Sequence, residues 1–143
     1  MEIGALLLKQ GMVSSAEVKE ATEEQQRTGE RLDRVLVRLG HVDSSTMLQA
    51  ISEQFSMPIV DLTAITPEPE LLKVLPSRLV FRQQCVPIDQ SDGTLRVATS
   101  DPFELTAFDE LRLLTGLSIE LVLANEEDLR DFIRQHYGVA GDT

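Results

Sequence analysis

The sequence predicts an α+β fold, in which tandem helical hairpins with four helices pack with a small α/β sandwich of about three strands. The helical part follows from an internal repeat, because residues 2–25 align without a gap on residues 31–54, at an offset of 29. The sandwich follows from a change in hydrophobic spacing after residue 84, from a helical to an alternating pattern. We therefore expect a repeated helical-hairpin subdomain over 1–57 and a small α/β subdomain over 58–143.

The two copies of the repeat share residues that begin, end and bury helices. Seven of the 24 aligned positions are identical. They are Leu7/Leu36, Gly11/Gly40, Val13/Val42, Ser15/Ser44, Ala21/Ala50, Glu24/Glu53 and Gln25/Gln54. A fixed period in this range indicates one supersecondary unit used twice, with each copy covering the apolar face of the other.

The first copy predicts a pair of helices. Apolar residues recur at helical spacing over 3–10, and Gly11 ends that helix. Ser14, followed three residues later by Glu17, is typical of a capping box, so the next helix begins there. That helix ends near Gly29.

The second copy repeats this plan. A short helix is expected over 32–39 and ends at Gly40, and Asp43 caps the helix that follows. The face of that helix which matches the first copy is formed by Met47, Ala50, Ile51 and Gln54. The pattern indicates two stacked hairpins with short loops.

The segment after the repeat changes character at Pro58. Proline pushes the residue before it out of the helical region, so 58–62 is expected to be extended. A Pro-rich join over 66–70 opens a short helix through 71–75, and another short helix is expected over 77–83.

Strand patterns follow. Segments 85–88 and 94–99 are strand-like and are separated by a turn that contains Asp92 and Gly93. A third strand is expected over 118–123.

Two helices complete the predicted sandwich. Asp101, with proline next and glutamate three residues on, predicts the start of a helix that ends at Gly116. Asn125 caps the last helix, which has three carboxylates in its first turn and ends at Gly138.

Composition excludes several classes of protein. The chain has 143 residues and a net charge of −11, which disfavours nucleic acid and anionic membrane surfaces as partners. The single cysteine, Cys85, permits no internal disulfide and fits a reducing cytoplasm. The apolar run at 5–8 is too short for a signal peptide or a membrane span. We expect a cytoplasmic protein without direct membrane insertion.

No motif predicts catalysis. None of the eight glycines is followed by lysine, so a Walker A loop is absent. His41 and His136 belong to no Cys/His cluster, and no zinc site is predicted. Cys85 begins an apolar strand, where a buried side chain is expected rather than a nucleophile. We therefore predict that this chain is not itself an enzyme.

The repeated unit resembles the tandem nucleotide-binding motif of the N-terminal (MshEN) domain of type II secretion and type IV pilus assembly ATPases. That motif opens with Arg-Leu-Gly, continues through an apolar run and a glycine, and closes on Leu-x-x-x-Leu-x-x-Gln. Later stretches are similar to the same family, and they are 58–62, 71–76, 98–102, 109–116 and 136–138. The resemblance extends from residue 2 to about residue 138.

The resemblance implies cyclic di-GMP as a candidate ligand and no other cofactor. In ligand-binding members the opening arginine meets the nucleotide, the glycine admits the phosphate, apolar residues pack on the bases, and the closing glutamine adds a hydrogen bond. An acidic residue after the second strand corresponds to a guanine-edge position. Carried over, the implied nucleotide-binding residues are Gly4, Val18, Gln25, Arg31, Leu32, Met47, Ile51, Gln54 and Asp101.

Two departures from the motif predict a degenerate nucleotide site. Glu2 stands where the first arginine is expected, and Asp33 stands where the second glycine is expected. Two unit charges about 4 Å apart interact by about 4 kcal/mol at an effective dielectric of about 20. A micromolar affinity corresponds to about 8 kcal/mol of binding free energy. Repulsion between each carboxylate and the ligand phosphates, even at a fraction of that strength, removes most of this free energy.

Most of the retained motif residues have a structural explanation as well. Leu32, Met47 and Ile51 suit helix packing, the two closing glutamines suit bridges between hairpins, and Asp101 suits a helix cap. Arg31 is the one residue that packing does not require.

By resemblance, the expected function is a non-catalytic regulatory and docking domain of a secretion or pilus motor ATPase. Its expected partners are a cytoplasmic domain of an inner-membrane platform protein and, where one follows in the same protein, the ATPase domain. The protein would then lie in the cytoplasm, peripheral to the inner membrane. The alternative is a cyclic di-GMP sensor that uses the tandem motifs. The choice between secretion and pilus stays open.

Overall fold

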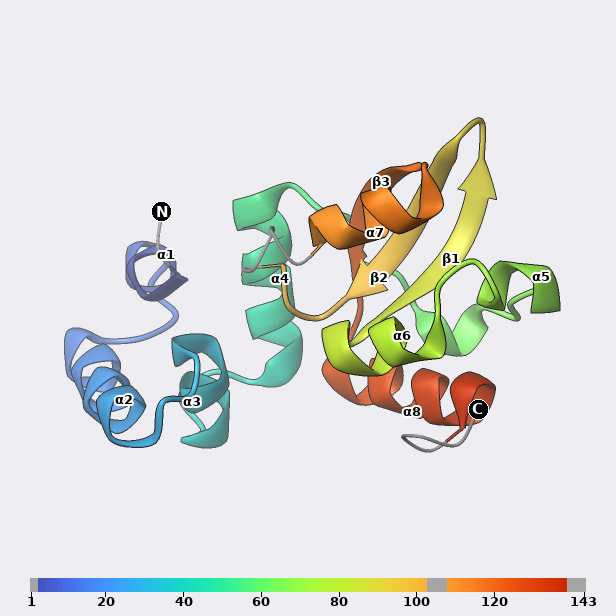
Figure 1. Ribbon diagram of the computed structural model, residues 1–143. Coiled ribbons are helices and arrows are strands. Elements are labelled where there is room, and N and C mark those ends of the chain that lie inside the picture. Colours follow the sequence, from blue (N-terminus) through green and yellow to red (C-terminus); the bar gives the residue numbers. More distant parts are fainter. Residues whose placement is uncertain (1–2, 103–107, 139–143) are drawn as a thin grey trace. The chain divides into compact units, whose positions relative to one another are not determined.

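The computed structural model describes residues 3–102 and 108–138, and the chain divides into two compact units, 1–56 and 57–143 (Figure 1). The described residues form eight α-helices, one 3-10 helix and three strands. The first unit is helical, and the second combines helices with a three-stranded sheet. The α+β class expected from the sequence is confirmed.

The first unit consists of α1 (Ile3–Lys9), α2 (Ser15–Thr28), α3 (Leu32–Arg38) and α4 (Ser44–Phe55). The helix ends follow local sequence signals. The Ser14 hydroxyl accepts a hydrogen bond from the Glu17 amide, while the Glu17 carboxylate accepts one from the Ser14 amide. The Asp43 carboxylate accepts the Thr46 amide at the start of α4. Both caps predicted from the sequence are confirmed.

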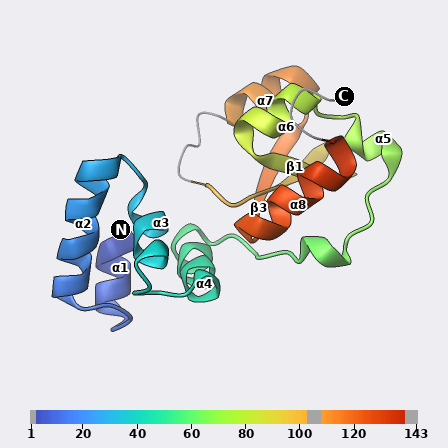
Figure 2. The same ribbon diagram turned by 90° about the horizontal axis from the view of Figure 1, so that it is seen from below.

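In the first unit, each helix packs chiefly against a helix of the other hairpin. The first helix of each hairpin packs against the second helix of the other, so that α1 contacts α4 and α3 contacts α2. Figure 2 shows these four helices from below. The apolar residues that are identical in both copies are all buried, and they are Leu7, Leu36, Val13, Val42, Ala21 and Ala50. Each hairpin thus covers apolar residues of the other, as expected for a supersecondary unit that is used twice.

The second unit is built on a sheet in the order β1-β2-β3, with β1 (Cys85–Ser91), β2 (Thr94–Thr99) and β3 (Ser118–Leu123). β1 pairs antiparallel with β2, and β2 pairs parallel with β3. A parallel pair needs a crossover, and the segment from 100 to 117 supplies it. Beyond β3, the Val60 amide donates to the Leu123 carbonyl at 2.8 Å, which adds a short parallel bridge.

Short helices surround this sheet, and they are η1 (Leu62–Ala64), α5 (Pro69–Leu72), α6 (Ser77–Gln83), α7 (Asp109–Thr115) and α8 (Glu126–Tyr137). α6 and α8 contact each other and β1, whereas α7 contacts β3 (Figure 1). Aliphatic residues dominate the core between them, including Leu79, Val86, Leu95, Val97 and Leu129. The predicted sandwich of about three strands is confirmed.

Two predicted segments are shorter or end earlier than expected. The helix expected through residue 75 ends at Leu72, because the amides of Lys73 and Val74 bond to carbonyls three residues back, those of Glu70 and Leu71, which is the tighter 3-10 pattern. Leu62 begins η1 instead of continuing the extended segment, since the Asp61 carboxylate accepts the Thr63 amide.

One strand is longer than predicted. β1 continues three residues beyond Ile88 to Ser91, and these residues are exposed. The turn residues Asp92 and Gly93 have φ values of 50° and 77°, which suit a two-residue hairpin. Cross-strand pairing therefore extends the strand where its alternating hydrophobic pattern has ended.

The helix predicted to begin at Asp101 is only partly described. Asp101 itself is not helical, residues 103–107 lie outside the described residues, and α7 begins at Asp109 with Phe108 as its cap. The end at Gly116, with φ of 70°, is as predicted.

Candidate functional site

The start of α3 holds an arginine and an aspartate in direct contact. Arg31 is the cap residue of α3 and has extended backbone angles, so its side chain folds over the first turn. Its Nε and Nη2 donate to Oδ1 and Oδ2 of Asp33, and both distances are 3.0 Å. The Arg31 side chain is 27% exposed and that of Asp33 is 8% exposed. This pair is therefore a bidentate, mostly buried ion pair.

The other first-unit residues of the implied nucleotide site fall into two groups. Gly4, Leu32, Met47 and Ile51 are buried within their helices. Val18 and Gln25 on α2, and Gln54 near the end of α4, are half-buried. Leu32, Met47 and Ile51 therefore contribute to the helical core, as the packing explanation predicts.

Asp101 lies in the second unit, apart in sequence from the eight other implied residues. Its backbone amide donates to the hydroxyl of Thr99, the buried last residue of β2, at 3.1 Å. Asp101 is half-buried just beyond that strand. The helix that Asp101 is predicted to cap would begin within 102–107, and 103–107 lie outside the described residues, so this capping role stays a prediction.

Polar contacts between the two repeats form a second constellation, which sequence reasoning missed. Arg38 at the end of α3 reaches Glu24 on α2 at 2.9 Å and Glu30 at 2.6 Å. In the other copy, the Gln10 amide donates to Glu53 on α4 at 2.8 Å. Glu24 and Glu53 occupy the same repeat position, so their identity was the available signal. The bridging role expected for the adjacent glutamines, Gln25 and Gln54, stays a prediction.

His41 also contributes polar contacts between the two repeats. Its Nδ1 lies 3.1 Å from a carboxylate oxygen of Glu17, and its Nε2 lies 2.5 Å from one of Glu20. His41 follows α3, and both glutamates belong to α2, so the imidazole links the two hairpins. The corresponding residue of the first copy is Met12, which is 42% exposed. The repeat pattern therefore gave no signal for this contact.

These contacts shift several pKa values in the first unit. The backbone amide of Ser14 lowers the pKa of the Glu17 carboxyl, and hydrogen bonds from Arg27 and Arg38 lower that of Glu24. The Thr46 amide likewise lowers the pKa of Asp43. The carboxylates that cap or bridge helices are thus held in their charged form.

The second unit holds the only cysteine of the chain. Burial raises the pKa of the Cys85 thiol to about 12, so the thiol is protonated at neutral pH. The predicted burial of Cys85 is confirmed. Burial also raises the pKa of Tyr137, whose hydroxyl donates to the Leu72 carbonyl at 2.9 Å.

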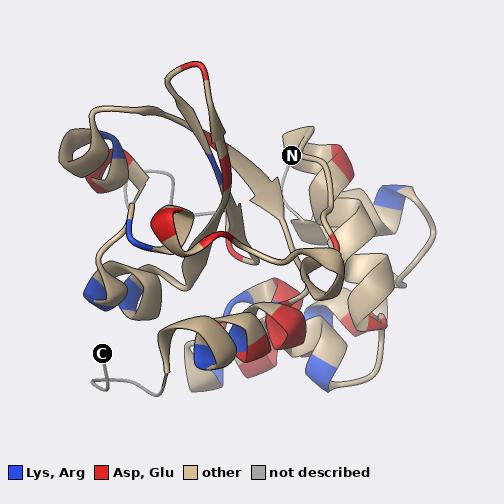
Figure 3. Cartoon of the chain, turned by 90° about the vertical axis from the view of Figure 1, so that its right-hand side faces the viewer, with Lys and Arg blue, Asp and Glu red and all other residues tan. Residues whose placement is uncertain are grey.

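Two hollows mark the surface of the second unit, each of about 600 Å³. One lies between the 66–71 segment and the β1–β2 turn, and its lining includes Glu68, Glu70, Asp89 and Asp92. The tip of that hairpin is acidic (Figure 3). The other hollow is more apolar and lies between α5 and the end of α8.

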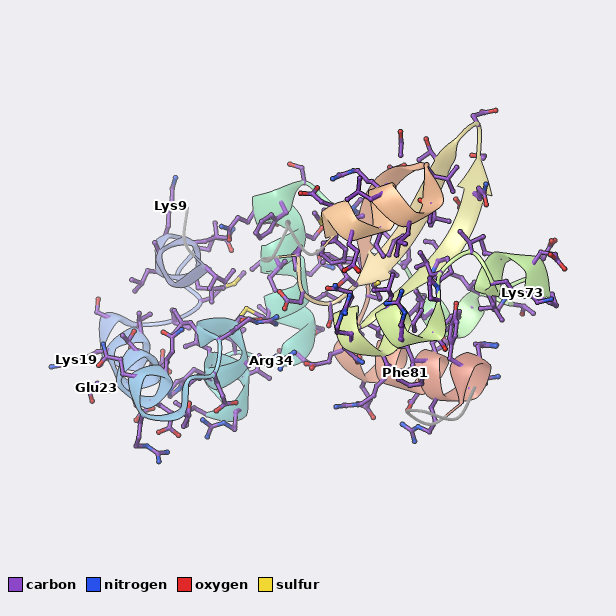
Figure 4. All side chains as sticks on the ribbon, in the orientation of Figure 1. Lys9, Lys19, Glu23, Arg34, Lys73 and Phe81 are labelled. Carbon is purple, nitrogen blue, oxygen red and sulfur yellow. The ribbon has the colours of Figure 1, made fainter. Side chains whose placement is uncertain are left out.

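The three lysines of the chain are all exposed. Lys9 ends α1, Lys19 lies on α2, and Lys73 follows α5 (Figure 4). Within residues 3–102 and 108–138, no group of three or more His, Cys, Asp or Glu side chains has an arrangement that could hold a metal ion. No helix in the same ranges has the length and apolar character to cross a membrane.

Comparison with known families identifies the domain. The sequence profile of the MshEN domain matches residues 55–143, which is more than half of the chain. The chain belongs to the MshEN domain family. The match begins at Phe55, the last residue of α4, and covers the whole second unit, whereas both copies of the tandem repeat lie before it.

Relatives of this MshEN domain include a type IV pilus assembly ATPase and a type II secretion system protein. It is 32% identical to the type IV pilus assembly ATPase PilB of Myxococcus xanthus over 139 residues, which is 97% of this chain and 25% of that protein. It is 29% identical to type II secretion system protein E of Xanthomonas campestris over 136 residues, which is 92% of this chain and 24% of that protein. The chain thus spans about a quarter of these relatives.

Two solved structures share the fold of this MshEN domain. A structure of MshE with cdg (cyclic di-GMP) matches with a TM-score of 0.88 and 32% identity, over 96% of this chain and 99% of that chain. The N-terminal domain of XpsE matches with a TM-score of 0.75 and 27% identity, over 93% and 92% of the two chains. Both comparisons include the repeated unit and the sandwich.

Proposed function

We propose that this MshEN domain is a non-catalytic regulatory and docking domain of a type IV pilus or type II secretion motor ATPase. The observation that carries the proposal is coverage. The chain corresponds to nearly all of the XpsE N-terminal domain but to only a quarter of PilB. In this proposal ATP hydrolysis belongs to the remainder of the parent protein, and its ATPase domain is one of the domain's partners.

The environments of the reactive side chains support a non-catalytic role. Cys85 is a buried neutral thiol. His41 is engaged by two carboxylates, and the ring of His136 packs on Phe132 with centroids 4.5 Å apart. The thiol is buried and both imidazoles have partners in their own unit, so none of these groups is placed as a nucleophile or general base.

The second proposed partner is a cytoplasmic domain of an inner-membrane platform protein. Residues 57–143 contain fifteen acidic and seven basic residues, whereas residues 1–56 contain nine and six. An excess of negative charge attracts a basic surface and speeds its association. Binding to the platform would place the protein in the cytoplasm, peripheral to the inner membrane.

Titration calorimetry with the purified cytoplasmic platform domain tests this proposal. We expect a complex whose affinity falls between about 0.1 M and 1 M salt, because the Debye length shrinks from about 10 Å to about 3 Å. Reversing two exposed acidic residues in E68K/E127K is expected to weaken the complex. The control K73E adds negative charge to the same unit and should bind at least as well. The absence of a complex for the unmodified domain would refute the docking function.

A cyclic di-GMP sensor is the second candidate function. It is favoured by the MshE structure with cdg, which shares the fold over 96% of this chain. The proposed contacts are Gly4, Val18, Gln25, Arg31, Leu32, Met47, Ile51, Gln54 and Asp101. Calorimetry with cyclic di-GMP tests this candidate, and the double variant E2R/D33G should bind more tightly than the unmodified domain. If neither protein binds the dinucleotide, the sensor function fails and the docking function is unaffected.

A further inference from the structure

We propose that the Asp33 carboxylate acts as an internal anion: it pairs with the Arg31 guanidinium and so prevents the second repeat from binding phosphate-bearing ligands. The proposal rests on the sensor function above and names what controls that site. It changes the role of Asp33, which the sequence alone presents as a charge that repels a ligand. In the structure, Asp33 also binds the Arg31 guanidinium, the cationic group that a phosphate would need.

The contact geometry makes Asp33 a direct competitor. The Nε–H and Nη2–H groups of Arg31 point at the two carboxylate oxygens of Asp33, both at 3.0 Å. Guanidinium binds a phosphate through the same planar fork of parallel hydrogen bonds. A phosphate cannot use that edge of Arg31 while the carboxylate holds it.

The competitor is also difficult to displace. Asp33 lies two residues from Arg31 in the chain, so its effective concentration at the guanidinium is on the order of millimolar or higher. The residue is 6% exposed. A ligand that took Arg31 would leave a buried carboxylate without this partner, which is strongly unfavourable. Both effects reduce the gain from a phosphate contact.

The first repeat has no such side chain at the equivalent position. Gly4 corresponds to Asp33 and is buried in the first turn of α1. The block is therefore a property of the second repeat, and a single substitution should remove it.

A double-mutant cycle on Arg31 and Asp33 tests the proposal with two probes, cyclic di-GMP and pyrophosphate as a simple diphosphate anion. D33N keeps the shape of the side chain and removes its charge, and it should raise affinity at least 10-fold. R31A/D33N should bind much more weakly than D33N. R31A alone should bind only slightly more weakly than the unmodified domain, because Asp33 already pairs with Arg31 there. E23Q removes one negative charge from an exposed site on α2 and should raise affinity less than 2-fold, which separates a local effect from net charge.

A measurement without ligand accompanies the titrations. In nitrogen-15 NMR, the Arg31 Nε–H should exchange slowly in the unmodified domain and at least 10-fold faster in D33N. D33G serves as a second release variant if D33N does not fold.

Each outcome decides a different point. Equal Arg31 Nε–H exchange in both proteins, or equal affinities of the unmodified domain and the release variants, would overturn the proposal. In the second case, cyclic di-GMP binding by the unmodified domain would preserve the sensor function. A gain for pyrophosphate that requires Arg31, with no cyclic di-GMP binding by any variant, would support the internal anion and refute the sensor. No binding of either probe by any variant would overturn both.

Discussion

Replacing Leu36 by alanine should destabilise the first unit severely. Leu36 is fully buried in α3. Truncation removes roughly three methylene-sized groups, worth about 0.8 kcal/mol each, and leaves a cavity. We expect a loss of about 3–4 kcal/mol in the free energy of unfolding, within the range of about 2–5 kcal/mol for such changes. The core of a unit as small as 1–56 supplies only about 3–5 kcal/mol, so the first unit of this variant should be near its unfolding midpoint in buffer.

The assay is urea denaturation combined with hydrogen exchange of the α1–α4 peptides. With a slope of about 1 kcal/mol per molar urea, the midpoint should fall by about 3 M. Leu7 is the repeat partner of Leu36 and is equally buried, so L7A should behave alike. The adjacent Leu8 is 37% exposed, and the control L8A should lose less than about 1 kcal/mol. A loss below about 1 kcal/mol in L36A would refute the inference that the two hairpins share one core.

Three further predictions concern caps, pH and the thiol. S14A should lower the free energy of unfolding by about 1 kcal/mol in thermal denaturation, because it removes one bond of the capping box, and D43N should retain most of its cap. The pKa values of Glu17, Glu24 and Asp43 are lowered in the folded state, so their stabilisation is complete above about pH 4.5 and is lost as pH falls through the folded values. Urea midpoints measured from pH 7 to pH 3 should show this loss, and a flat profile would contradict it. Cys85, with a pKa of about 12, should resist a thiol reagent at pH 8 until urea unfolds the second unit, and prompt labelling of the folded domain would contradict its burial.

Local signals accounted for most element boundaries. Helix starts at Ser14, Asp43 and Asn125 were predictable, because an N-cap involves only backbone amides within the next three residues. Errors occurred where longer-range pairing or a later residue decided the end of an element. β1 extends because β2 pairs with it, and α5 ends at Leu72 because Lys73 and Val74 form tighter turns that the apolar spacing does not reveal.

The candidate site was less predictable than the fold. The sequence placed Arg31 and Asp33 two residues apart but did not indicate whether they would touch. Side chains two apart on a helix do not face each other. They meet here because Arg31 is extended at the cap position and lies outside the helix. The backbone conformation of Arg31 therefore decides whether its guanidinium can pair with Asp33.

The amino-acid sequence by itself determined the duplicated architecture, the helix caps, the change to a β pattern and the acidic charge of this protein. These properties depend on composition or on residues a few positions apart. Only the tertiary structure decided which helices pack against each other. It also decided the contacts of Arg38 with Glu24, 14 residues away, and of His41 with Glu20, 21 residues away, which connect the two hairpins. Such contacts depend on how the chain folds back on itself, and the equivalent positions in the other repeat hold different side chains.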